Sequence, residues 1–351
     1  MLPATPVSDR PFVSVLICTR NRGEHVVASL RSVQADGYQN FELLILDQSD
    51  DDRTERAVAD LSAKDARVKY VRLPLPGKPG ALNRGLELAL GEYILLTDDD
   101  CEVVPGWMGA MVDAFEREPR VGCVHGDVSA GPHDPTEGYI PICRIERSHT
   151  IFRLHDFAIM PKWSNFGIGA NMALRRSAAQ AIAGCDPCIG PGAKFRTGDD
   201  TDMGVQVLRR GYAMHFSAEA SVIHHGFRLW KSAKQDVERS GFAQGAIFVK
   251  HLRCGTLYRG AVHGLWESAS ECLERAVRGQ RPLGLTYPLS WVRGSLSALF
   301  HRVDPRTNQF VKLSDQQVHA FAHHVAEVVM PQDRARATDP AGSVAAPPKP
   351  S

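Results

Sequence analysis

YILLTDDDC, residues 93–101, is an apolar run that ends in three consecutive carboxylates. A run of apolar and β-branched residues after Gly91 and Glu92 is typical of a buried strand in a parallel sheet. Open α/β sheets bind their ligands at the carboxyl ends of such strands. We therefore expect the chemistry of this protein at Asp98, Asp99 and Asp100.

These three aspartates offer hard oxygen ligands. Successive side chains of an extended segment alternate between two faces, so Asp98 and Asp100 are expected on one side and Asp99 on the other. The neighbouring residues include no Lys or Arg that would neutralise them. Two carboxylates on one face suit Mg²⁺ or Mn²⁺, especially an ion shared with substrate phosphates. The alternative is a solvated acidic turn before a helix that begins near Pro105.

Strand and helix patterns alternate before this stretch. Residues 12–18, 42–46 and 68–73 are predicted strands, with helical patterns at 24–36 and 53–63 between them. Such alternation favours an α/β fold with a mostly parallel central sheet and helices on both faces. Further predicted elements are a helix from Pro105, strands at 121–130, 212–216 and 220–223, and helical segments at 233–252, 262–278 and 287–302.

Composition narrows the class of protein. The 351 residues are 43% hydrophobic and 23% charged, as in an ordinary globular protein with one large α/β domain and an appendage, or two modest domains. The net charge is +1 without a long basic block, so no nucleic-acid partner is expected. Eight scattered cysteines, the absence of an apolar signal core and the absence of a long apolar run favour a reducing, cytoplasmic location.

Polar residues also follow the earlier strands. Asp47 ends the second strand beside an acidic turn, where it suits a ribose or a base better than an ordinary loop position. Residues 77–85, GKPGALNRG, lead a small-residue turn into a helix. Glycines permit close backbone approach, and a helix start with cations suits a phosphate, although such a segment can also be a simple turn.

The order of FVSVLICTRNR, LLILDQSDD and GKPGALNRGLELALGEYILLTDDD resembles the nucleotide-binding half of family 2 glycosyltransferases with a GT-A fold. The resemblance covers roughly residues 11–225. It implies a nucleotide-diphosphate sugar donor, with a UDP-sugar favoured, and Mn²⁺ or Mg²⁺ as cofactor. The implied roles are Thr19 and Arg20 near the nucleotide, Asp47 on the nucleoside, Lys78 and Asn83 lining the site, Asp98 towards the ribose, Asp99 within the same DxD-type motif, and Asp100 as the direct metal ligand.

Residues 165–176 are similar to the G-x-N-x-A-x-R element of that family, in which the chain passes under the donor sugar. Gly169 permits close approach, and Asn171 offers both donor and acceptor atoms. Cys185 stands where the family often has an aromatic residue. The resemblance thus accounts for the pair Cys185 and Cys188 without a metal or redox role.

A second acidic cluster, TGDDTDMG at residues 197–204, stands at a predicted helix start. Helix starts favour acidic residues, so simple capping competes with a catalytic role. The family has two acidic residues here, and the resemblance makes Asp200 the general base and Asp199 a donor-site residue. A histidine near position 224 contacts the metal or the diphosphate in some members; His224 is preferred here over His225.

The C-terminal region and three single residues each allow two interpretations. Residues 231–330 form either a helical layer packed on the catalytic domain or a basic, aromatic-edged surface that contacts a membrane with a lipid-linked acceptor. His149, His155 and Trp163 are packing residues or acceptor contacts. The predicted chain organisation has four parts: an N-terminal tail (1–10), a GT-A catalytic domain (11–225), a C-terminal helical extension (226–330) and a disordered tail (331–351). The catalytic domain has a nucleotide-binding half at 11–100 and an acceptor and catalytic half at 101–225.

The predicted function is transfer of one sugar from a nucleotide-diphosphate sugar to the hydroxyl of a glycan, lipid-linked or small-molecule acceptor. The enzyme would be metal-dependent, inverting and, because the QxxRW motif of processive members is not visible, non-processive (EC 2.4, hexosyltransferase type). A sugar-phosphate nucleotidyltransferase is one alternative, but it would show a glycine-rich loop where residues 19–22 read TRNR. A non-catalytic nucleotide-sugar binding protein is another, and both acidic clusters argue against it. We expect the protein in the cytoplasm, at the inner face of the membrane if its acceptor is lipid-linked.

Overall fold

The computed structural model describes residues 10–157, 167–256 and 286–311, with positions 265, 266, 269, 270, 273, 274 and 277 between the last two ranges. The chain divides into two units, Met1–Val311 and Lys312–Ser351, and all described residues belong to the first. The predicted tail 331–351, nine residues of the predicted tail 1–10, Trp163 and the side chain of His155 lie outside this description.

A nine-stranded sheet forms the centre of this unit. The four strands at one end of the sheet run parallel, whereas β9 is antiparallel to both of its neighbours, and β6 and β10 are again parallel. The predicted α/β class with a mostly parallel sheet is thereby confirmed. In spatial order the strands are β3 (Val68–Arg72), β2 (Phe41–Asp47), β1 (Val13–Thr19), β4 (Tyr93–Asp98), β9 (Asn171–Arg175), β6 (Val121–Ala130), β10 (Ala213–His224) and β5 (Cys101–Val103), while β8 (His149–Ile151) also pairs with β10.

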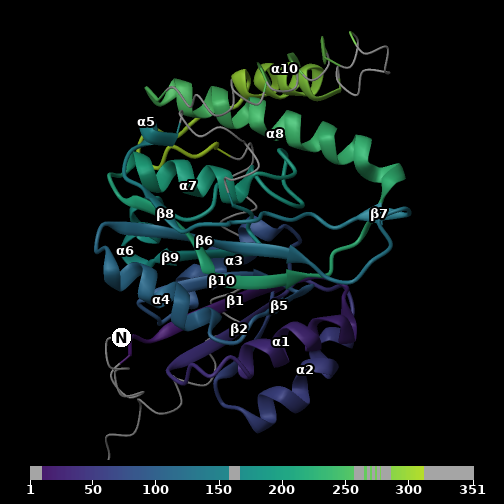
Figure 1. Cartoon of the computed structure of the whole chain (residues 1–351), viewed down its shortest axis with the longest axis vertical. Coiled ribbons are helices and arrows are strands. Elements are labelled where there is room, and N and C mark those ends of the chain that lie inside the picture. The colour runs from purple at the N-terminus through teal and green to yellow at the C-terminus, as the bar shows by residue number, and fades with distance from the viewer. Residues whose placement is uncertain are drawn as a thin grey trace, which may run out of the picture. The chain divides into compact units, whose positions relative to one another are not determined.

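Helices cover both faces of the sheet (Figure 1). Alternate side chains of β1 show why: Ile17 belongs to one buried cluster and Leu16 to another on the opposite face. Each such fully buried side chain stabilises the fold by roughly 1.5–3 kcal/mol. The first cluster includes residues of α1 (Val26–Gln34), α2 (Arg53–Lys64) and α4 (Trp107–Arg117); the second includes residues of α3 (Lys78–Leu88), α6 (Arg176–Ala181) and α7 (Asp199–Arg209).

Several short elements complete the unit. Strands β7 and β11 form a separate two-stranded sheet. Within the described residues, no helix is both long and apolar enough to cross a bilayer. The short elements are η2 (Gly23–His25), β7 (Gly138–Tyr139), α5 (Leu154–Phe157), β11 (Arg228–Leu229) and η4 (Trp230–Ser232).

Two helices of the C-terminal region pack closely together. They are α8 (Ala233–Arg253) and α10 (Thr286–Leu299), as predicted from the patterns at 233–252 and 287–302. A Cβ at Gly294 would lie 1.9 Å from the carbonyl oxygen of Phe242, and one at Gly245 would lie 2.0 Å from that of Trp291. Glycine is therefore required where the two backbones cross. In Figure 1, α8 lies between α7 and α10.

The strand assignments at β9 and β10 differ from the sequence analysis, and the short strands β5, β7, β8 and β11 were not predicted either. The segment of β9 was predicted only as a backbone element under the sugar, because its short apolar pattern follows a stretch without periodicity. The two predicted strands at 212–216 and 220–223 are one strand, β10, with an irregularity between Ser217 and Ser221. A bulge of this kind interrupts the alternation by which a continuous strand is recognised.

Candidate active site

The polar residues at several strand ends meet at one edge of the sheet. Thr19 lies opposite Asp47 in the pairing of β1 with β2, and Cys18 lies opposite Asp98 in the pairing of β1 with β4. Because β10 runs parallel to β6, and β6 parallel to β4 across β9, the carboxyl end of β10 at His224 lies at the same edge. This is the edge at which α/β sheets bind ligands.

The three aspartates at the end of β4 do not alternate as predicted. Asp98 ends the strand, and Asp99 and Asp100 form a turn before β5. Arg22 contacts both turn residues, with Nε 3.4 Å from Asp99 Oδ2 and Nη2 3.0 Å from Asp100 Oδ2. The expectation of opposite faces was wrong because it assumed an extended chain through Asp100.

Cations from other elements partly neutralise these carboxylates. Lys78, at the start of α3, forms an ion pair with Asp98. Burial alone would lower the pKa of Lys78, but the charges of Asp98 and Asp199 outweigh it and hold that pKa well above its ordinary value. Thr19 donates a 2.7 Å hydrogen bond to Asp99. Burial nevertheless raises the pKa of Asp99 to about 6.

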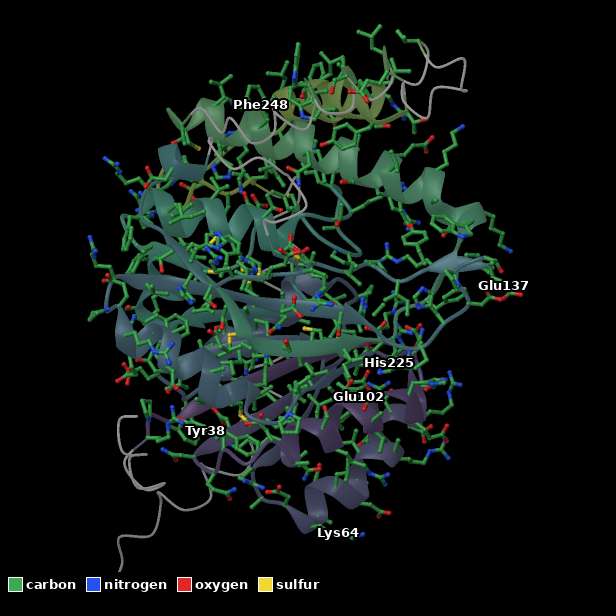
Figure 2. The ribbon with its side chains drawn as sticks, viewed as in Figure 1. Tyr38, Lys64, Glu102, Glu137, His225 and Phe248 are labelled. Carbon is green, nitrogen blue, oxygen red and sulfur yellow. The ribbon has the colours of Figure 1, made fainter. Side chains whose placement is uncertain are left out.

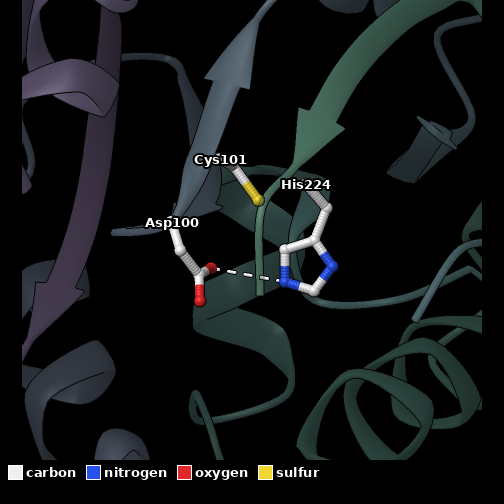
Figure 3. A group of neighbouring side chains, drawn as sticks. All are labelled: Asp100, Cys101 and His224. Atoms are coloured by element: carbon white, nitrogen blue, oxygen red, sulfur yellow. Dashed lines mark ion pairs between the residues drawn. The ribbon is translucent and has the colours of Figure 1, made fainter. Parts of the chain in front are cut away.

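Asp100 and His224 face each other, with Oδ1 and Nε2 3.3 Å apart (Figure 3). His224 Nδ1 lies 2.8 Å from the carbonyl oxygen of Pro141; since a carbonyl only accepts, Nδ1 carries the proton. Burial opposes charge on His224, but the hydrogen bond with Asp100 outweighs it and raises the imidazole pKa. Cys101, which is fully buried, lies in the same group of possible ligands.

The space beside Asp100 and His224 is kept open by Gly226. A Cβ at that position would lie 2.6 Å from His224 Nε2 and 3.0 Å from Asp100 Oδ2. His225, the alternative ligand, pairs instead with Glu102, with Nε2 and Oε1 3.0 Å apart (Figure 2). A carboxylate oxygen and an imidazole whose second nitrogen is fixed by a backbone carbonyl are a fitting donor set for a divalent cation.

The second acidic cluster begins α7, as its helix-start pattern predicted. Asp200 accepts hydrogen bonds from the backbone N–H groups of Gly169, at 2.8 Å, and Thr201, at 2.6 Å. A Cβ at Gly169 would lie 3.8 Å from Lys78 Nζ, so the two acidic clusters adjoin through Lys78. Burial raises the pKa of Asp200 and raises that of Asp199 to about 7.

The assembled site therefore holds an excess of negative charge. Five carboxyl groups, Asp98 to Asp100 with Asp199 and Asp200, stand against the permanent cations Lys78 and Arg22. Such an excess in a partly buried site attracts cations and suits a hard oxygen-bound metal.

Four predicted donor-site residues are engaged elsewhere. Asp47 is fully buried and accepts hydrogen bonds from Ser49 and Tyr70. Arg20 forms an exposed ion pair with Asp50, at 3.2 Å. Asn83 forms hydrogen bonds with backbone atoms, and Asn171 forms them with backbone carbonyls and a buried indole. All four residues therefore shape the surroundings of the cluster.

The two asparagines hold chain segments in place. Asn83 donates to the carbonyl oxygen of Cys185 and accepts from its N–H, which fixes the loop after α6 against α3. Asn171 is fully buried, accepts from Trp107 Nε1 at 2.8 Å, and donates to the carbonyl oxygens of Asp127 and Ala220, each at 2.9 Å. All the polar atoms of the Asn171 side chain are thus used inside the fold.

Arg22 is the main site residue that the sequence analysis passed over. The stretch TRNR contains two arginines, and only the three-dimensional pairing shows that the second one reaches the carboxylates of Asp99 and Asp100. Gly226 was likewise not selected. His149, considered as an acceptor contact, stacks on Phe216 with ring centroids 4.8 Å apart.

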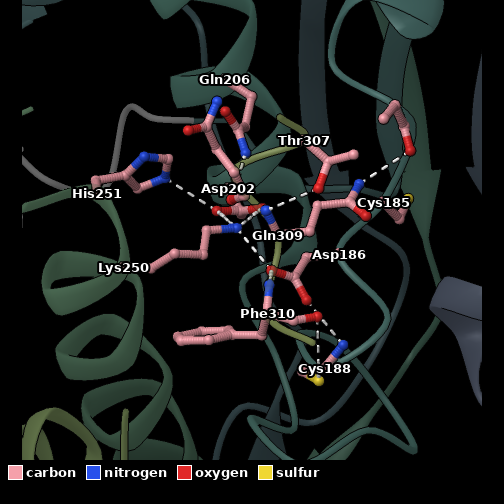
Figure 4. A network of polar contacts seen from close by, with 12 residues as sticks. Cys185, Asp186, Cys188, Asp202, Gln206, Lys250, His251, Thr307, Gln309 and Phe310 are labelled. Atoms are coloured by element: carbon pink, nitrogen blue, oxygen red, sulfur yellow. Dashed lines mark hydrogen bonds and ion pairs between the residues drawn. The ribbon is translucent and has the colours of Figure 1, made fainter. Parts of the chain in front are cut away.

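A buried ion network connects α7 with α8 (Figure 4). Lys250 Nζ lies 2.8 Å from Asp186 and 2.6 Å from Asp202, and His251 Nε2 lies 2.9 Å from Asp202. Asp186 also accepts from the N–H of Phe310. Asp202 is two residues after Asp200, so this network anchors the helix that carries the candidate base.

Two other features lie apart from this chemistry. Cys185 and Cys188 are buried, and Cys185 Sγ is 3.2 Å from the sulfur of Met203. A hollow of about 360 Å³ lies beside α4, where Arg10, Asp113 and His215 are among its lining residues. It contains none of the predicted site residues, so we place the site at the strand ends.

The fold is that of known glycosyltransferases. The mannosyltransferase PcManGT from Pyrobaculum calidifontis, solved with GDP-Man and Mn²⁺, aligns with a TM-score of 0.58 and 17% identity, over 85% of this chain and 89% of that one. Residues 1–349 of S. aureus TarS align with a TM-score of 0.55 and 12% identity, over 81% of this chain and 78% of that one. With its mostly parallel sheet and flanking helices, the described unit has the GT-A fold.

Residues 14–183 match the model of glycosyl transferase family 2. The predicted resemblance is confirmed. Among curated relatives, the beta-monoglucosyldiacylglycerol synthase of Trichormus variabilis is 36% identical over 120 residues, which are 32% of this chain and 25% of that protein. The GalNAc(5)-diNAcBac-PP-undecaprenol beta-1,3-glucosyltransferase of Campylobacter jejuni is 30% identical over 104 residues, 29% and 34% of the two chains. The aligned parts thus cover 25% to 34% of these relatives.

Proposed function

We propose that the protein is a metal-dependent, inverting and non-processive glycosyltransferase that moves one sugar from a nucleotide-diphosphate sugar to an acceptor hydroxyl. The observation that carries the proposal is the cluster of five carboxyl groups with Lys78, Arg22 and His224 at the strand ends of a GT-A domain. Both acidic clusters of the sequence contribute to it, although about a hundred residues separate them.

Asp100 and His224 are the residues that would hold a divalent cation, Mn²⁺ or Mg²⁺. The open space at Gly226 and the fixed tautomer of His224 support this assignment. When bound, such an ion supplies positive charge that favours departure of a diphosphate. An imidazole ligand fits Mn²⁺ better than Mg²⁺. That PcManGT was solved with Mn²⁺ gives further support.

Asp200 would act as the general base that takes the proton of the attacking hydroxyl. Two backbone N–H groups fix its carboxylate, and burial raises its pKa, which makes the ionised form a stronger base. A direct attack opposite the leaving group inverts the anomeric centre. Asp199 and Lys78, beside it, would bind the donor sugar and the diphosphate.

The nucleotide would lie against the ends of β1 and β4, near Thr19, Arg20, Asp98 and Asp99. UDP is the favoured nucleotide. Arg22, which already pairs with two carboxylates, would move towards phosphate oxygens because a bidentate guanidinium suits them. Asp47, Asn83, Gly169 and Asn171 would shape the pocket, and Gly169 would let the backbone approach the sugar.

The acceptor is proposed to be lipid-linked. Two relatives are named for a diacylglycerol product and an undecaprenol-linked substrate. Peripheral membrane contact through residues 231–330, with a cytoplasmic location at the inner face of the membrane, completes the proposal. Cys18, Cys101, Cys123, Cys185 and Cys254 are free thiols, which supports a reducing compartment.

Substitution of the candidate base tests the proposed reaction. Asp200→Asn is expected to keep donor affinity and to lose turnover by about 10²-fold or more, because the hydroxyl proton has no acceptor. The measurement is release of nucleoside diphosphate from a panel of nucleotide sugars, with Asp60→Asn on the exposed face of α2 as the matched control. Release of pyrophosphate by the wild type from a nucleoside triphosphate and a sugar phosphate would indicate a nucleotidyltransferase. Donor binding without release in any condition would indicate a binding protein.

A further inference from the structure

The outer side of α10 is an apolar surface. Five large side chains on it are exposed: Leu289 by 60%, Val292 by 49%, Leu296 by 53%, Leu299 by 57% and, just after the helix, Phe300 by 84%. The four within the helix are three to four residues apart, which places them along one face, and Phe300 follows the last of them. We call these five residues the α10 stripe. An apolar surface of this continuity on a folded domain marks an interaction site.

The α10 stripe cannot turn inward, because the opposite side of α10 is fixed against α8. Gly241, Gly245 and Gly294 allow the backbones to touch, with no room for a Cβ at any of them. Ser295 Oγ donates to the carbonyl oxygen of Gly245 at 3.1 Å. Rotation of α10 would place larger side chains where only glycine fits. The outward orientation of the stripe is therefore built into the helix pair.

Within residues 286–303 the Asp, Glu, Lys and Arg residues have one sign of charge. Residues 286–303 contain no Asp or Glu. Arg293 and Arg302, both exposed, lie among or directly after the apolar positions. Long arginine side chains beside an apolar face suit a surface that is apolar inside and anionic outside, as phospholipid headgroups over acyl chains are.

The chain just before α10 adds side chains of the same kind. Trp266, Leu273 and Val277 are largely exposed in the described positions between α8 and α10. Their separations of seven and four residues correspond to one face of a helix. Two consecutive segments of the C-terminal region thus expose apolar side chains at helical spacing.

We infer that the α10 stripe is a docking surface for an anionic lipid bilayer. The five apolar side chains enter the layer below the headgroups, and Arg293 and Arg302 remain with the lipid phosphates. The inference specifies which surface makes the membrane contact of the proposed function, and it rests on that proposed function. One helix, α8, links the docked surface to α7, since Lys250 of α8 binds Asp202 of α7 at 2.6 Å.

Vesicle co-sedimentation of the full chain tests the docking surface. The wild type is expected to sediment with phosphatidylcholine vesicles that contain phosphatidylglycerol, and less with phosphatidylcholine alone. The double variant Leu296→Ser with Phe300→Ser should lose about tenfold or more of this binding, because both apolar groups leave the bilayer. Arg293→Glu should weaken binding to the anionic vesicles and leave the weaker binding to neutral ones unchanged.

Leu90→Ser with Val104→Ser is the matched control, since it removes two exposed apolar side chains from loops elsewhere in the chain. The inference is overturned if the wild type does not sediment with either vesicle, or if both double variants lose binding equally. It is also overturned if the stripe variant only converts a dimer to a monomer, because the stripe would then bind a second copy. Nucleotide binding in the same preparations reports separately on the donor site: its absence beside intact vesicle binding contradicts the proposed function alone.

Discussion

Asp199 occupies the first position of α7, where it is 8% exposed and adjoins Lys78, Asp98 and Asp200. Burial, with the charge of Asp200, raises its pKa from 3.8 to about 7. The folded protein therefore holds this proton more tightly than the unfolded chain does. Ionisation of Asp199 destabilises the fold, and that penalty grows as pH rises from about 4 to about 7.

Asp199→Asn should consequently stabilise the protein at neutral pH, by roughly 1–4 kcal/mol, and by almost nothing near pH 4. The measurement is the free energy of unfolding by urea across this pH range. Asp60→Asn, on the exposed face of α2, serves as control and should change it little. A loss of stability in Asp199→Asn at neutral pH would contradict the electrostatic account of the site.

His224 makes the affinity of the proposed metal site for a cation depend on pH. The hydrogen bond with Asp100 raises its pKa, so a proton on Nε2 competes with a cation for the same lone pair. Mn²⁺ affinity should rise with pH through that raised pKa, and His224→Gln should remove most of the rise and weaken binding about tenfold or more. Calorimetric titration with Mn²⁺ measures both. His225→Gln, the adjacent control, should behave as the wild type; the reverse result would assign the ligand to His225.

At the scale of elements, the C-terminal helices are part of the support of the candidate active site. Lys250 is fully buried, and its ammonium group contacts Asp186 after α6 and Asp202 in α7. Burial opposes charge on Lys250, but these two carboxylates raise its pKa above the ordinary value. Helix α8 thereby fixes the direction of α7, at whose start Asp199 and Asp200 lie.

Lys250→Met should destabilise the protein by about 3–5 kcal/mol, because it leaves two buried carboxylates without their cation. Urea unfolding measures the loss, and Lys234→Met, at an exposed position of the same helix, should cost under about 0.5 kcal/mol. Adding Asp202→Asn to Lys250→Met should restore part of the stability. Equal unfolding midpoints for the two lysine variants would show that the network contributes nothing.

At the scale of the whole molecule, the strands and helices that are determined by local sequence patterns could be predicted. Apolar runs that end in polar residues placed β1, β2 and β4 almost to the residue, and their common edge follows from parallel pairing. The helix start at Asp199 was equally visible, whereas α3 begins at Lys78, within the stretch 77–85 that was predicted to start as a turn. Strand β9 was not predicted, because three apolar residues after an irregular stretch give too weak a period.

Roles that depend on distant partners could not be predicted. Asp47 and Asn171 have the residue types of ligand contacts, yet Tyr70 and Trp107 reach them only in the folded chain. Arg22 and Lys250 presented the reverse case: neither has a distinctive local pattern, and their importance comes from carboxylates 78 and 48 to 64 residues away. Sequence patterns show the period of an element, whereas these contacts are set by how elements meet.

The central claim is that the two acidic clusters form one metal-dependent site for a nucleotide diphosphate. Calorimetric titration with UDP, GDP and dTDP, each with Mn²⁺ and with EDTA, tests it most directly. The account predicts that one nucleotide binds in the presence of Mn²⁺, that EDTA removes this binding, and that Asp100→Ala weakens it about tenfold or more while Asp60→Ala does not. Binding of no nucleotide under either condition, or binding that neither EDTA nor Asp100→Ala alters, would contradict the account.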